Sequence, residues 1–278
     1  MSWNEKQLEL LIENYKNTSI NGLSKIIKKG NKAIKNKLIE LNLYDEELIK
    51  NNTYKVAPNL CEKLLNDSIQ NAHFWGLFYS DGCIDRNRIA IGLQDNDFDY
   101  LKQISDIYNG KIYKKVSHYV YNNEKRYSYA HVMSLTDWKN IPLFINKLGI
   151  KERKTYNPPD NLNFLNSKEL VIAFYIGLVD GDGTLRITKN KTFWLTSIVV
   201  HKSWYNILLE LKYKLKEFCN IETNVALEKC RDRCRIMLFK QKQFKYFQDF
   251  IVENKLVCME RKWFIDKKLE HDERMSVV

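Results

Sequence analysis

A repeated segment constrains this chain more than any other feature of its sequence. Residues 146–156 read NKLGIKERKTY and residues 254–264 read NKLVCMERKWF, with six identities in eleven positions and an aromatic residue closing each copy. The copies lie about a hundred residues apart, which is too long for a solenoid repeat and typical of a duplicated subdomain. The sequence therefore predicts a pseudo-twofold protein built from two similar halves.

Each half opens with an apolar helix that ends in Asp-Gly. The helix ends read FWGLFYSDG over residues 74–82 and YIGLVDGDG over residues 175–183. Because both segments are apolar on almost every side, we expect them to be buried. A mid-helix glycine costs about 1 kcal/mol relative to alanine, yet Gly76 and Gly177 hold the same place in both copies. This predicts that the two helix backbones touch at these glycines.

The aspartate at each helix end is electrostatically unfavourable by itself. Asp81 and Asp182 face the negative ends of their helix dipoles, which typically costs about 0.3–1 kcal/mol, and crossing the helices brings the two like charges together. A divalent cation shared by both would reverse the sign of these effects. We expect Gly82 and Gly183, the residues that follow, to be left-handed caps.

The rest of each half predicts an α+β fold with an antiparallel sheet. We expect strands over residues 88–93, 111–116, 127–135, 185–188, 193–200, 224–229 and 235–239, and helices over 69–81, 98–108, 141–148, 168–182, 205–218 and 244–254. The expected units are a helical module with its linker over 1–57, a first subdomain over 58–157 and a second over 158–278.

A lysine-rich segment precedes the two halves. Residues 4–43 read as three short helices, and the sequence from Asn14 through Ile39 has seven lysines and no acidic residue. It resembles a helix-turn-helix DNA-binding module, whose last helix enters the major groove. A small bundle with a solvated lysine face is the alternative. The polar residues 45–60 are expected to form a linker. The candidate DNA contacts here are Lys28, Lys29, Lys32 and Lys35.

The overall charge favours a polyanionic partner. There are 45 Lys and Arg against 34 Asp and Glu, for a net charge of +11, which favours nucleic acid over a membrane surface. The longest apolar run, 170–179, has about half of the ~20 residues that a membrane span needs. No signal-peptide pattern opens the chain, so we expect an intracellular protein, cytoplasmic or in an organellar matrix. The six cysteines show no CxxC spacing, which argues against zinc or a disulfide framework.

The paired motifs resemble the LAGLIDADG homing endonucleases in their single-chain, two-motif form. The resemblance covers residues 68–278 and implies an αββαββα fold in each half, with curved antiparallel sheets. It implies a monomeric, Mg²⁺-dependent endodeoxyribonuclease, with Mn²⁺ expected to substitute. Such an enzyme makes a double-strand break in a long asymmetric DNA site and serves intron homing.

The resemblance also assigns a metal site. In the family the last acidic residue of each motif binds the metal, which maps onto Asp81 and Asp182. A backbone carbonyl just before it assists, here at Ser80 and Gly181. The first copy departs from the family by having Tyr79 and Ser80 where an Asp and a small residue are usual.

The resemblance implies further catalytic residues at strand ends. Gln94 and His201 match polar residues that order water, and Lys240 matches a basic residue that neutralises charge. Strict alignment places Asp137 at the first-half counterpart of Lys240, which leaves Lys139 as the approximate candidate. Each of these residues has a solvated surface role as its alternative reading.

Basic residues on the strands are the candidate DNA contacts of the two halves. Arg can read guanine through two hydrogen bonds, whereas Lys chiefly holds phosphate. The sequence does not decide which face of a sheet each one occupies. The candidates are Arg86, Arg88, Arg186, Lys189, Lys191, Lys229, Arg231, Arg233 and Arg235.

Two other functions remain open at this point. An RNA-splicing maturase of the same fold would bind structured RNA, and a regulatory DNA-binding protein of this fold would lack catalysis. A calcium loop starting at Asp180 is excluded, because its sixth position is Leu185 and its twelfth is Lys191. The two intact aspartates favour the nuclease.

Overall fold

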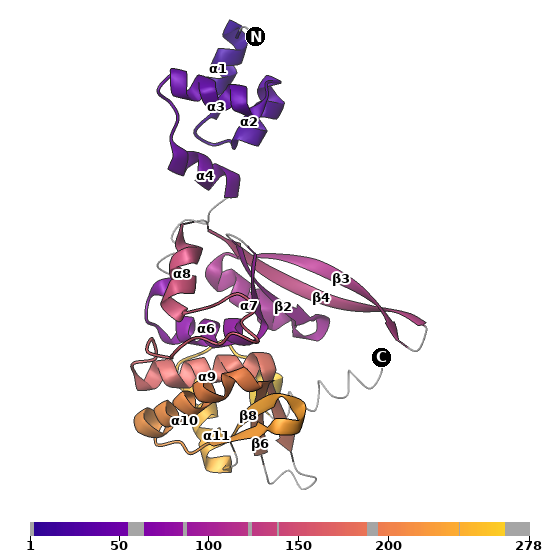
Figure 1. The fold of residues 1–278 in the computed structure, drawn as a ribbon, viewed down its shortest axis with the longest axis vertical. Helices are drawn as coiled ribbons and strands as arrows, with labels where there is room; N and C mark the ends of the chain where they lie inside the picture. The colour runs from indigo at the N-terminus through magenta and orange to yellow at the C-terminus, as the bar shows by residue number, and fades with distance from the viewer. Residues whose placement is uncertain are drawn as a thin grey trace.

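The protein consists of a small helical module and a larger α+β body. The computed structural model describes residues 3–54, 64–85, 88–121, 124–137, 139–187, 194–238 and 240–264. In Figure 1 the N-terminal helices stand apart from the body. The expected boundary at 57/58 lies outside the described residues. Within the described part, no helix is both long enough and apolar enough to cross a bilayer.

The N-terminal module has a hydrophobic core of its own. Its helices are α1 (Glu5–Asn14), α2 (Ile20–Ile27), α3 (Asn31–Glu40) and α4 (Glu46–Tyr54). Buried apolar side chains from all four helices meet in its centre, separate from the core of the body. They are Leu11, Leu23, Ile27, Ile34, Leu38 and Ile49.

The linker expected over 45–60 is in its first half a helix that belongs to the module. Helix α4 occupies Glu46–Tyr54. The Asp45 side chain accepts the backbone N–H of Leu48 at 3.0 Å, and Ile49 closes the module core. The helix is short and mostly polar, and of its described residues only Ile49 is buried, so its sequence resembles a linker.

Each half of the body contains a four-stranded antiparallel sheet, which confirms the predicted class. The first sheet has the order β1-β2-β4-β3, with β1 (Gly82–Asp85), β2 (Arg88–Gln94), β3 (Lys111–Tyr121) and β4 (Glu124–Thr136). The second repeats that order as β5-β6-β8-β7, with β5 (Gly183–Ile187), β6 (Trp194–His201), β7 (Asn224–Glu228) and β8 (Arg233–Leu238).

Helices cover one face of each sheet. The first half contains α6 (Ile69–Asp81), the 3₁₀ turn η1 (Asp95–Asp97), α7 (Phe98–Tyr108) and α8 (Asn140–Leu148). The second contains α9 (Lys168–Asp182), the 3₁₀ turns η2 (Lys202–Trp204) and η3 (Lys229–Arg231), α10 (Tyr205–Cys219), α11 (Gln241–Glu253) and α12 (Glu260–Trp263). Helix α7 packs on β2, β3 and β4, and α10 packs on β7 and β8. Figure 1 shows α6 and α9 side by side between the halves.

The β3–β4 hairpin is longer than its sequence pattern predicts. The expected strands, 111–116 and 127–135, extend in the structure to Tyr121 and back to Glu124. Beyond the body the two strands hydrogen-bond to each other without a core beneath them, and Val120 is 69% exposed. Alternation of apolar and polar residues reports burial, so it cannot reveal a strand that stands free in solvent.

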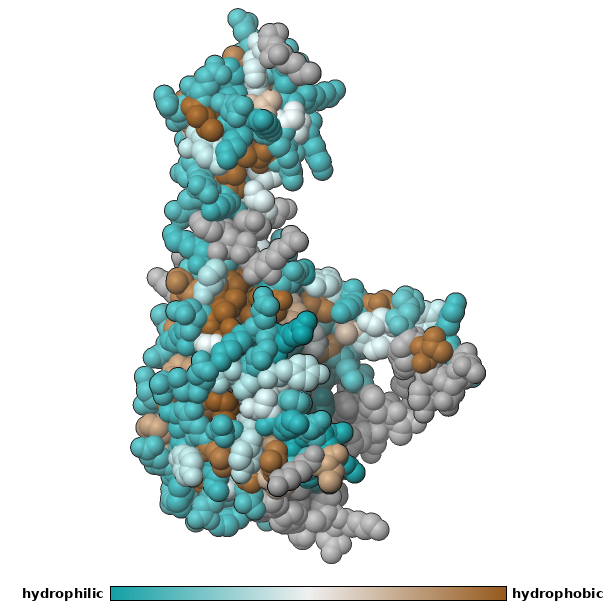
Figure 2. Space-filling model, in the orientation of Figure 1, coloured by the Kyte–Doolittle hydropathy of each residue, from teal (hydrophilic) through white to brown (hydrophobic). Residues whose placement is uncertain are grey.

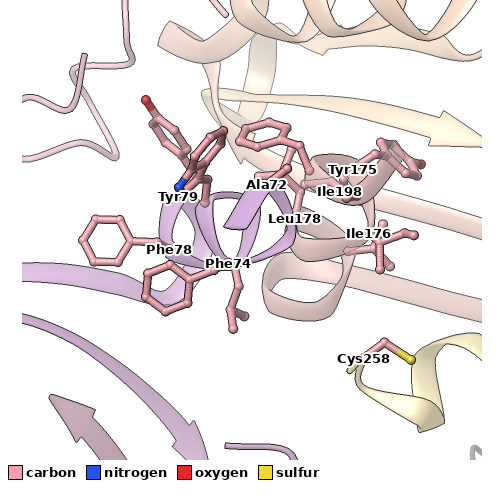
Figure 3. Packing of buried hydrophobic residues seen from close by; sticks show 14 of the residues in the cluster. Ala72, Phe74, Phe78, Tyr79, Tyr175, Ile176, Leu178, Ile198 and Cys258 are labelled. Carbon is pink, nitrogen blue, oxygen red and sulfur yellow. The ribbon is translucent and has the colours of Figure 1, made fainter. Parts of the chain in front are cut away.

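The two long helices cross in backbone contact at their glycines. A Cβ atom on Gly76 would lie 2.1 Å from the carbonyl oxygen of Phe174, and one on Gly177 would lie 2.0 Å from that of His73. Large aromatic side chains such as Phe74 surround the crossing (Figure 3). The helix dimer therefore forms the centre of a core that both halves share.

The glycines after the two helices are not left-handed caps, so that expectation is wrong. Gly82 has φ −75° and ψ 150°, and Gly183 has φ −74° and ψ 147°, both extended. A Cβ on either glycine would lie 2.4 Å from a carbonyl of the last helical turn, that of Phe78 or Val179. The chain passes directly from helix to strand, and glycine is required by this close passage instead of by a positive φ.

The helix pair is asymmetric around one buried carboxylate. Asp180 is fully buried and accepts hydrogen bonds from His73 Nε2 at 2.7 Å, Tyr100 OH at 2.9 Å, Trp263 Nε1 at 2.7 Å and the Met259 N–H at 3.1 Å. Burial and the Asp180 charge raise the pKa of Tyr100 well above its usual value, so this phenol remains a donor.

The first half has an aromatic pair at the equivalent place. Tyr79 occupies the motif position of Asp180, and Phe174 that of His73. The rings of Tyr79 and Phe174 meet edge to face, with centroids 5.7 Å apart. Tyr79 OH also donates to the carbonyl of Leu148. The first motif therefore differs from the second at Tyr79, and the residue that packs against it on the facing helix, Phe174, differs from its counterpart as well.

The glycine crossing predicts a large effect of one methyl group. Gly76→Ala and Gly177→Ala should each destabilise the protein by roughly 1–3 kcal/mol or more, because the added carbon overlaps a backbone carbonyl that cannot move aside. Urea unfolding measures the change. Gly92→Ala is the matched control, because its Cβ would meet only Val132 Cγ2 at 3.6 Å. Equal stability of all three variants would contradict the crossing.

The buried carboxylate predicts a second stability effect. Asp180→Asn should cost about 3 kcal/mol, because the amide places N–H groups against donors and leaves buried groups unpaired. The exposed Asp160, paired with Lys151 at 2.6 Å, provides the control, and Asp160→Asn should cost less than about 1 kcal/mol. Similar thermal unfolding curves for the two variants would show that the Asp180 network contributes little.

Candidate active site

The two predicted metal-binding aspartates lie at touching helix ends. Asp81 is the last residue of α6 and Asp182 the last of α9. Between them the backbones are close, because a Cβ on Gly181 would lie 2.3 Å from Ser80 Cβ and 3.0 Å from Asp81 Oδ2. The structure therefore brings together all four residues predicted for the metal site.

The surroundings disfavour the charged form of both carboxyls. Burial, with the negative charge of Asp182 added, raises the pKa of Asp81 to about 6. Burial also raises the pKa of Asp182, although this residue reaches the protein surface. Lys154 and Lys262 counteract the shift at both carboxyls. The C-terminal, negative ends of both helix dipoles also meet here and add negative potential.

The same two lysines cap the paired helices. Lys154 Nζ donates to the carbonyls of Tyr79 at 2.6 Å and Ser80 at 2.7 Å. Lys262 Nζ donates to the carbonyls of Val179 at 3.0 Å, Asp180 at 2.6 Å and Gly181 at 2.5 Å.

Sequence reasoning missed both lysines, although the signal was present. Each is the ninth residue of its copy of the repeated 11-residue segment. The repeat indicates a shared role for the two lysines as well as a duplication. A cation at each helix C-terminus is what the dipole favours.

The two lysines differ in the hydrogen bonds that remain to them. An ammonium group has three donors, and those of Lys262 all point to helix carbonyls. Lys154 uses two on carbonyls, which leaves one donor for a ligand. Burial lowers the pKa of Lys262 to about 8 and also lowers that of Lys154. Lys262 is therefore mainly a helix cap, whereas Lys154 can also bind an anion.

Each lysine-bearing segment is anchored on the opposite half of the protein. Trp204 Nε1, in the second half, donates to the carbonyls of Lys154 at 3.0 Å and Thr155 at 3.1 Å. Arg261 makes two hydrogen bonds to the buried Asp97 of the first half, at 2.8 and 2.9 Å. The position of both lysines thus depends on the pairing of the halves.

A cavity of about 740 Å³ opens beside Lys154 and Asp182. His201, at the end of β6, lines it together with Arg231 from the turn η3 and Arg233 from the start of β8. The cavity collects two carboxylates, those of Asp182 and Asp232, with an ammonium group, an imidazole and two guanidinium groups from both halves of the chain. Such a lining suits a phosphate-bearing ligand.

The ring of His201 is held in one orientation. Its Nδ1 accepts the backbone N–H of Ser203 at 3.3 Å, and its ring meets that of Tyr156 edge to face at 4.9 Å. With Nδ1 as acceptor, the proton of a neutral imidazole lies on Nε2. Gln94 holds the corresponding place at the end of β2 and is exposed.

The other predicted catalytic lysines lie elsewhere. Lys240 Nζ pairs with Glu222 at 2.7 Å and lines a different cavity. Lys139 Nζ pairs with Glu47 of α4 at 2.8 Å. Asp137 is buried and accepts the backbone N–H groups of Lys139 and Asn140 at 3.0 Å each, so it caps α8. The structure does not place these residues with the aspartates.

The strand register decides which basic residues share the helix-free face of each sheet. In the second sheet, Cys234, Ile236 and Leu238 are buried, so Arg233 and Arg235 face away from the core, and Arg235 pairs with Glu228. Arg186 on β5 is also exposed.

The first sheet adds further residues to its own helix-free face. Arg88 pairs with Asp85 at 2.6 Å. Lys111 lies opposite Ser134 and Lys115 lies opposite Ala130, and both pairs belong to this face. Arg86, Lys189, Lys191 and the side chain of Lys229 lie outside the described residues.

The lysines predicted for the N-terminal module lie at its surface or at its edge. Lys28 is the left-handed residue after α2, with φ 57°. Lys32 and Lys35 are exposed on α3. The ammonium group of Lys29 lies 5.7 Å from the ring centre of Trp3, and that of Lys35 lies 5.0 Å from that of Tyr44.

The donor set at the paired aspartates fits a hard cation. It offers the carboxylates of Asp81 and Asp182 and the carbonyls of Ser80 and Gly181, all oxygen donors that Mg²⁺ prefers. Within the described residues, no three His, Cys, Asp or Glu side chains gather for metal binding. A cation here would therefore take its other ligands from water and phosphate, as Mg²⁺ commonly does.

The comparisons with known proteins show the fold. No family model and no curated protein matches the sequence. The homing endonuclease I-WcaI bound to its DNA recognition sequence is similar in structure, with 14% identity, a TM-score of 0.50, and coverage of 77% of this chain and 97% of that one. The N-terminal LAGLIDADG domain of DUF199/WhiA has 18% identity and a TM-score of 0.42, and the match covers 69% of this chain and 89% of that one. The likeness to I-WcaI shows that this chain has the LAGLIDADG homing endonuclease fold.

The raised pKa of Asp81 predicts how the metal-free protein responds to pH. Since the folded-state pKa lies above the usual 3.8, ionised Asp81 destabilises the fold at neutral pH, and this penalty shrinks as the pH falls below about 6 and is gone below about 3.8. Asp81→Asn should therefore stabilise the protein in EDTA at pH 7.5 by about 1 kcal/mol, allowing for solvent screening.

Thermal unfolding with and without Mg²⁺ tests this prediction. Added Mg²⁺ should raise the Tm of the wild type and leave that of Asp81→Asn unchanged. Asp106→Asn, an exposed substitution on α7, should respond to Mg²⁺ as the wild type does. A lower Tm for Asp81→Asn in EDTA would contradict the proposed cost of ionising Asp81.

Proposed function

We propose that this chain is a site-specific DNA endonuclease that acts as a monomer and makes a metal-dependent double-strand break in a long asymmetric target. One observation carries the proposal. The carboxylates of Asp81 and Asp182 meet at the ends of two crossing helices, beside a lysine and a cavity of about 740 Å³ lined by Arg231, Arg233 and His201. The similar structure of I-WcaI, bound to a DNA recognition sequence, supports the assignment through its fold.

The paired aspartates would hold Mg²⁺ or Mn²⁺, assisted by the carbonyls of Ser80 and Gly181. The bound ion supplies a more acidic water and neutralises phosphate charge. The raised pKa of both aspartates is a cost that cation binding would relieve. Strain held at the site before binding is common in enzymes, where stability is lost in favour of activity.

Lys154 would donate its remaining N–H to the scissile phosphate. A preorganised cation stabilises the charge that builds on phosphate oxygens in the transition state. Its ammonium is fixed by two helix carbonyls and its backbone by Trp204 of the other half. Lysine held in this way needs little reorganisation during the reaction.

His201 and Gln94 would order water at the two strand ends. The Nε2–H of His201 is the donor left over after Nδ1 binds Ser203, and it can bind a water or a phosphate oxygen in the cavity. Gln94 offers an amide in the equivalent place. The two halves therefore present different side chains to the two DNA strands.

The helix-free faces of the sheets would bind the duplex. Basic side chains from both sheets lie on them, and the β3–β4 hairpin extends the first sheet away from the body (Figure 1). Alternate side chains of a strand can reach base edges in the major groove. Mobilisation of a host intron, in an intracellular compartment, is the biological role that we propose with this activity.

Cleavage of a randomised duplex library in Mg²⁺ tests the function directly. We expect defined double-strand products from the wild type and none from Asp81→Asn or Asp182→Asn, whose binding should persist. Cutting by either variant would remove that aspartate from the metal site. Failure of the wild type to cut, with tight binding of structured RNA, would favour a maturase. Tight DNA binding without cutting would favour a regulator.

The lysines give a second prediction within the same assay. Lys154→Met should lower the cleavage rate about 10²–10³-fold and should also cost stability, because it leaves the carbonyls of Tyr79 and Ser80 without their donor. Lys262→Met should mainly destabilise the fold, because it leaves three helix carbonyls without a donor. Lys139→Gln is the control and should cut like the wild type. Normal cleavage by Lys154→Met would contradict its role.

A further inference from the structure

We propose that helix α3 of the N-terminal module is a recognition helix that reads a short element containing an adenine–thymine step in the major groove. This element would lie on the same duplex, outside the part covered by the two sheets. The inference rests on the proposed function only in taking duplex DNA as the partner. It adds a second sequence-reading site to that function.

The connection between α2 and α3 has the form of a helix-turn-helix. Three residues, 28–30, separate the helices, and Lys28 has φ 57°. Ser24 Oγ donates to the Lys29 carbonyl at 2.6 Å, and Asn31 Nδ2 donates to Asn21 Oδ1 at 2.5 Å. A turn of three or four residues with a glycine is typical of this motif, whose second helix enters the major groove.

One face of α3 is fixed in the module core. Ile34 and Leu38 are fully buried there. The opposite face carries Lys32, Asn36 and Ile39, which follow the helical spacing i, i+4, i+7 and are exposed. Because the core fixes α3 through its buried face, these side chains are presented to solvent on a rigid element.

The chemistry of that face fits base recognition better than simple solvation. A carboxamide matches the donor and acceptor of adenine in the major groove, and an apolar side chain contacts the thymine methyl group. The Asn36 side chain makes no hydrogen bond to any other described residue. Ile39, directly beside it, is 50% exposed. Asn36 and Ile39, in the second half of α3, together offer the two contacts that an adenine–thymine step takes.

The surrounding charge fits the DNA backbone. No acidic residue occurs from Asn14 through Ile39, whereas seven lysines do. Glu40, the last residue of α3, pairs with Lys37 at 2.6 Å and so offsets the charge of that lysine. In Figure 2 the visible surface of the module is mainly hydrophilic, with small apolar patches. The major groove of duplex RNA is too deep and narrow for side chains to read. A helix that offers Asn36 and Ile39 on the same face as Lys32 therefore favours duplex DNA over duplex RNA.

Selection from a fully randomised duplex DNA pool tests the proposal with the full-length protein in EDTA, where no cleavage occurs. We expect the wild type to select a central motif and a separate short motif that contains the adenine–thymine step. Asn36→Ala should lower the preference for that adenine about tenfold to a hundredfold. Ile39→Ala should lower the preference for the neighbouring thymine.

Two control variants separate base reading from charge. Lys32→Gln should weaken binding to all sequences alike and reduce the salt dependence of log K by about 0.9. Asn17→Ala, an exposed substitution between α1 and α2, should change nothing. Wild-type preferences in both Asn36→Ala and Ile39→Ala would overturn the proposal, as would the absence of a second motif or equal competition by the same pool made as duplex RNA.

The result is independent of the nuclease assignment. The central motif and cleavage in Mg²⁺ report on the two sheets and the aspartates. The second motif and its response to Asn36→Ala report on α3 alone. A protein that selects the second motif but never cuts would support the recognition helix and contradict the endonuclease.

Discussion

The contact between α6 and α9 is the constraint on which the rest of this structure depends. Gly76 and Gly177 let the two backbones meet where any Cβ would overlap a carbonyl. Because the helices meet so closely, their C-terminal ends converge as well, and Asp81 and Asp182 share one site. The geometry of the fold centre thus disfavours the ionised aspartates, a cost that a cation would relieve.

The pseudo-symmetry of the halves is broken at the paired helix ends. Lys154 keeps a donor for a ligand, whereas Lys262 uses all three on helix carbonyls. The buried Asp180–His73 pair opposes an aromatic pair in the other half. Because both halves belong to one chain, their sequences can differ, whereas the two subunits of a homodimer are identical.

Much of the architecture could be predicted from the sequence, because its signals are local. Apolar helices with a glycine in the same place, the repeated segment and the strand pattern give the duplicated α+β fold. Two of the failures, helix α4 and the outer hairpin, share one physical cause, since periodicity reports only burial. Helix α4 buries little beyond Ile49, and the outer β3–β4 hairpin buries almost nothing, so neither leaves a clear pattern.

The sequence by itself identified the two aspartates as the candidate metal ligands, the two glycines as the helix contact, and the basic residues as a sign of a polyanionic partner. Only the tertiary structure decided that Lys154 and Lys262 cap the helices, and that Lys139 and Lys240 pair with glutamates elsewhere. It also placed Arg231 and Arg233 beside Asp182. The reason is that a lysine or arginine side chain is long and flexible, so its partner depends on which distant segments fold beside it.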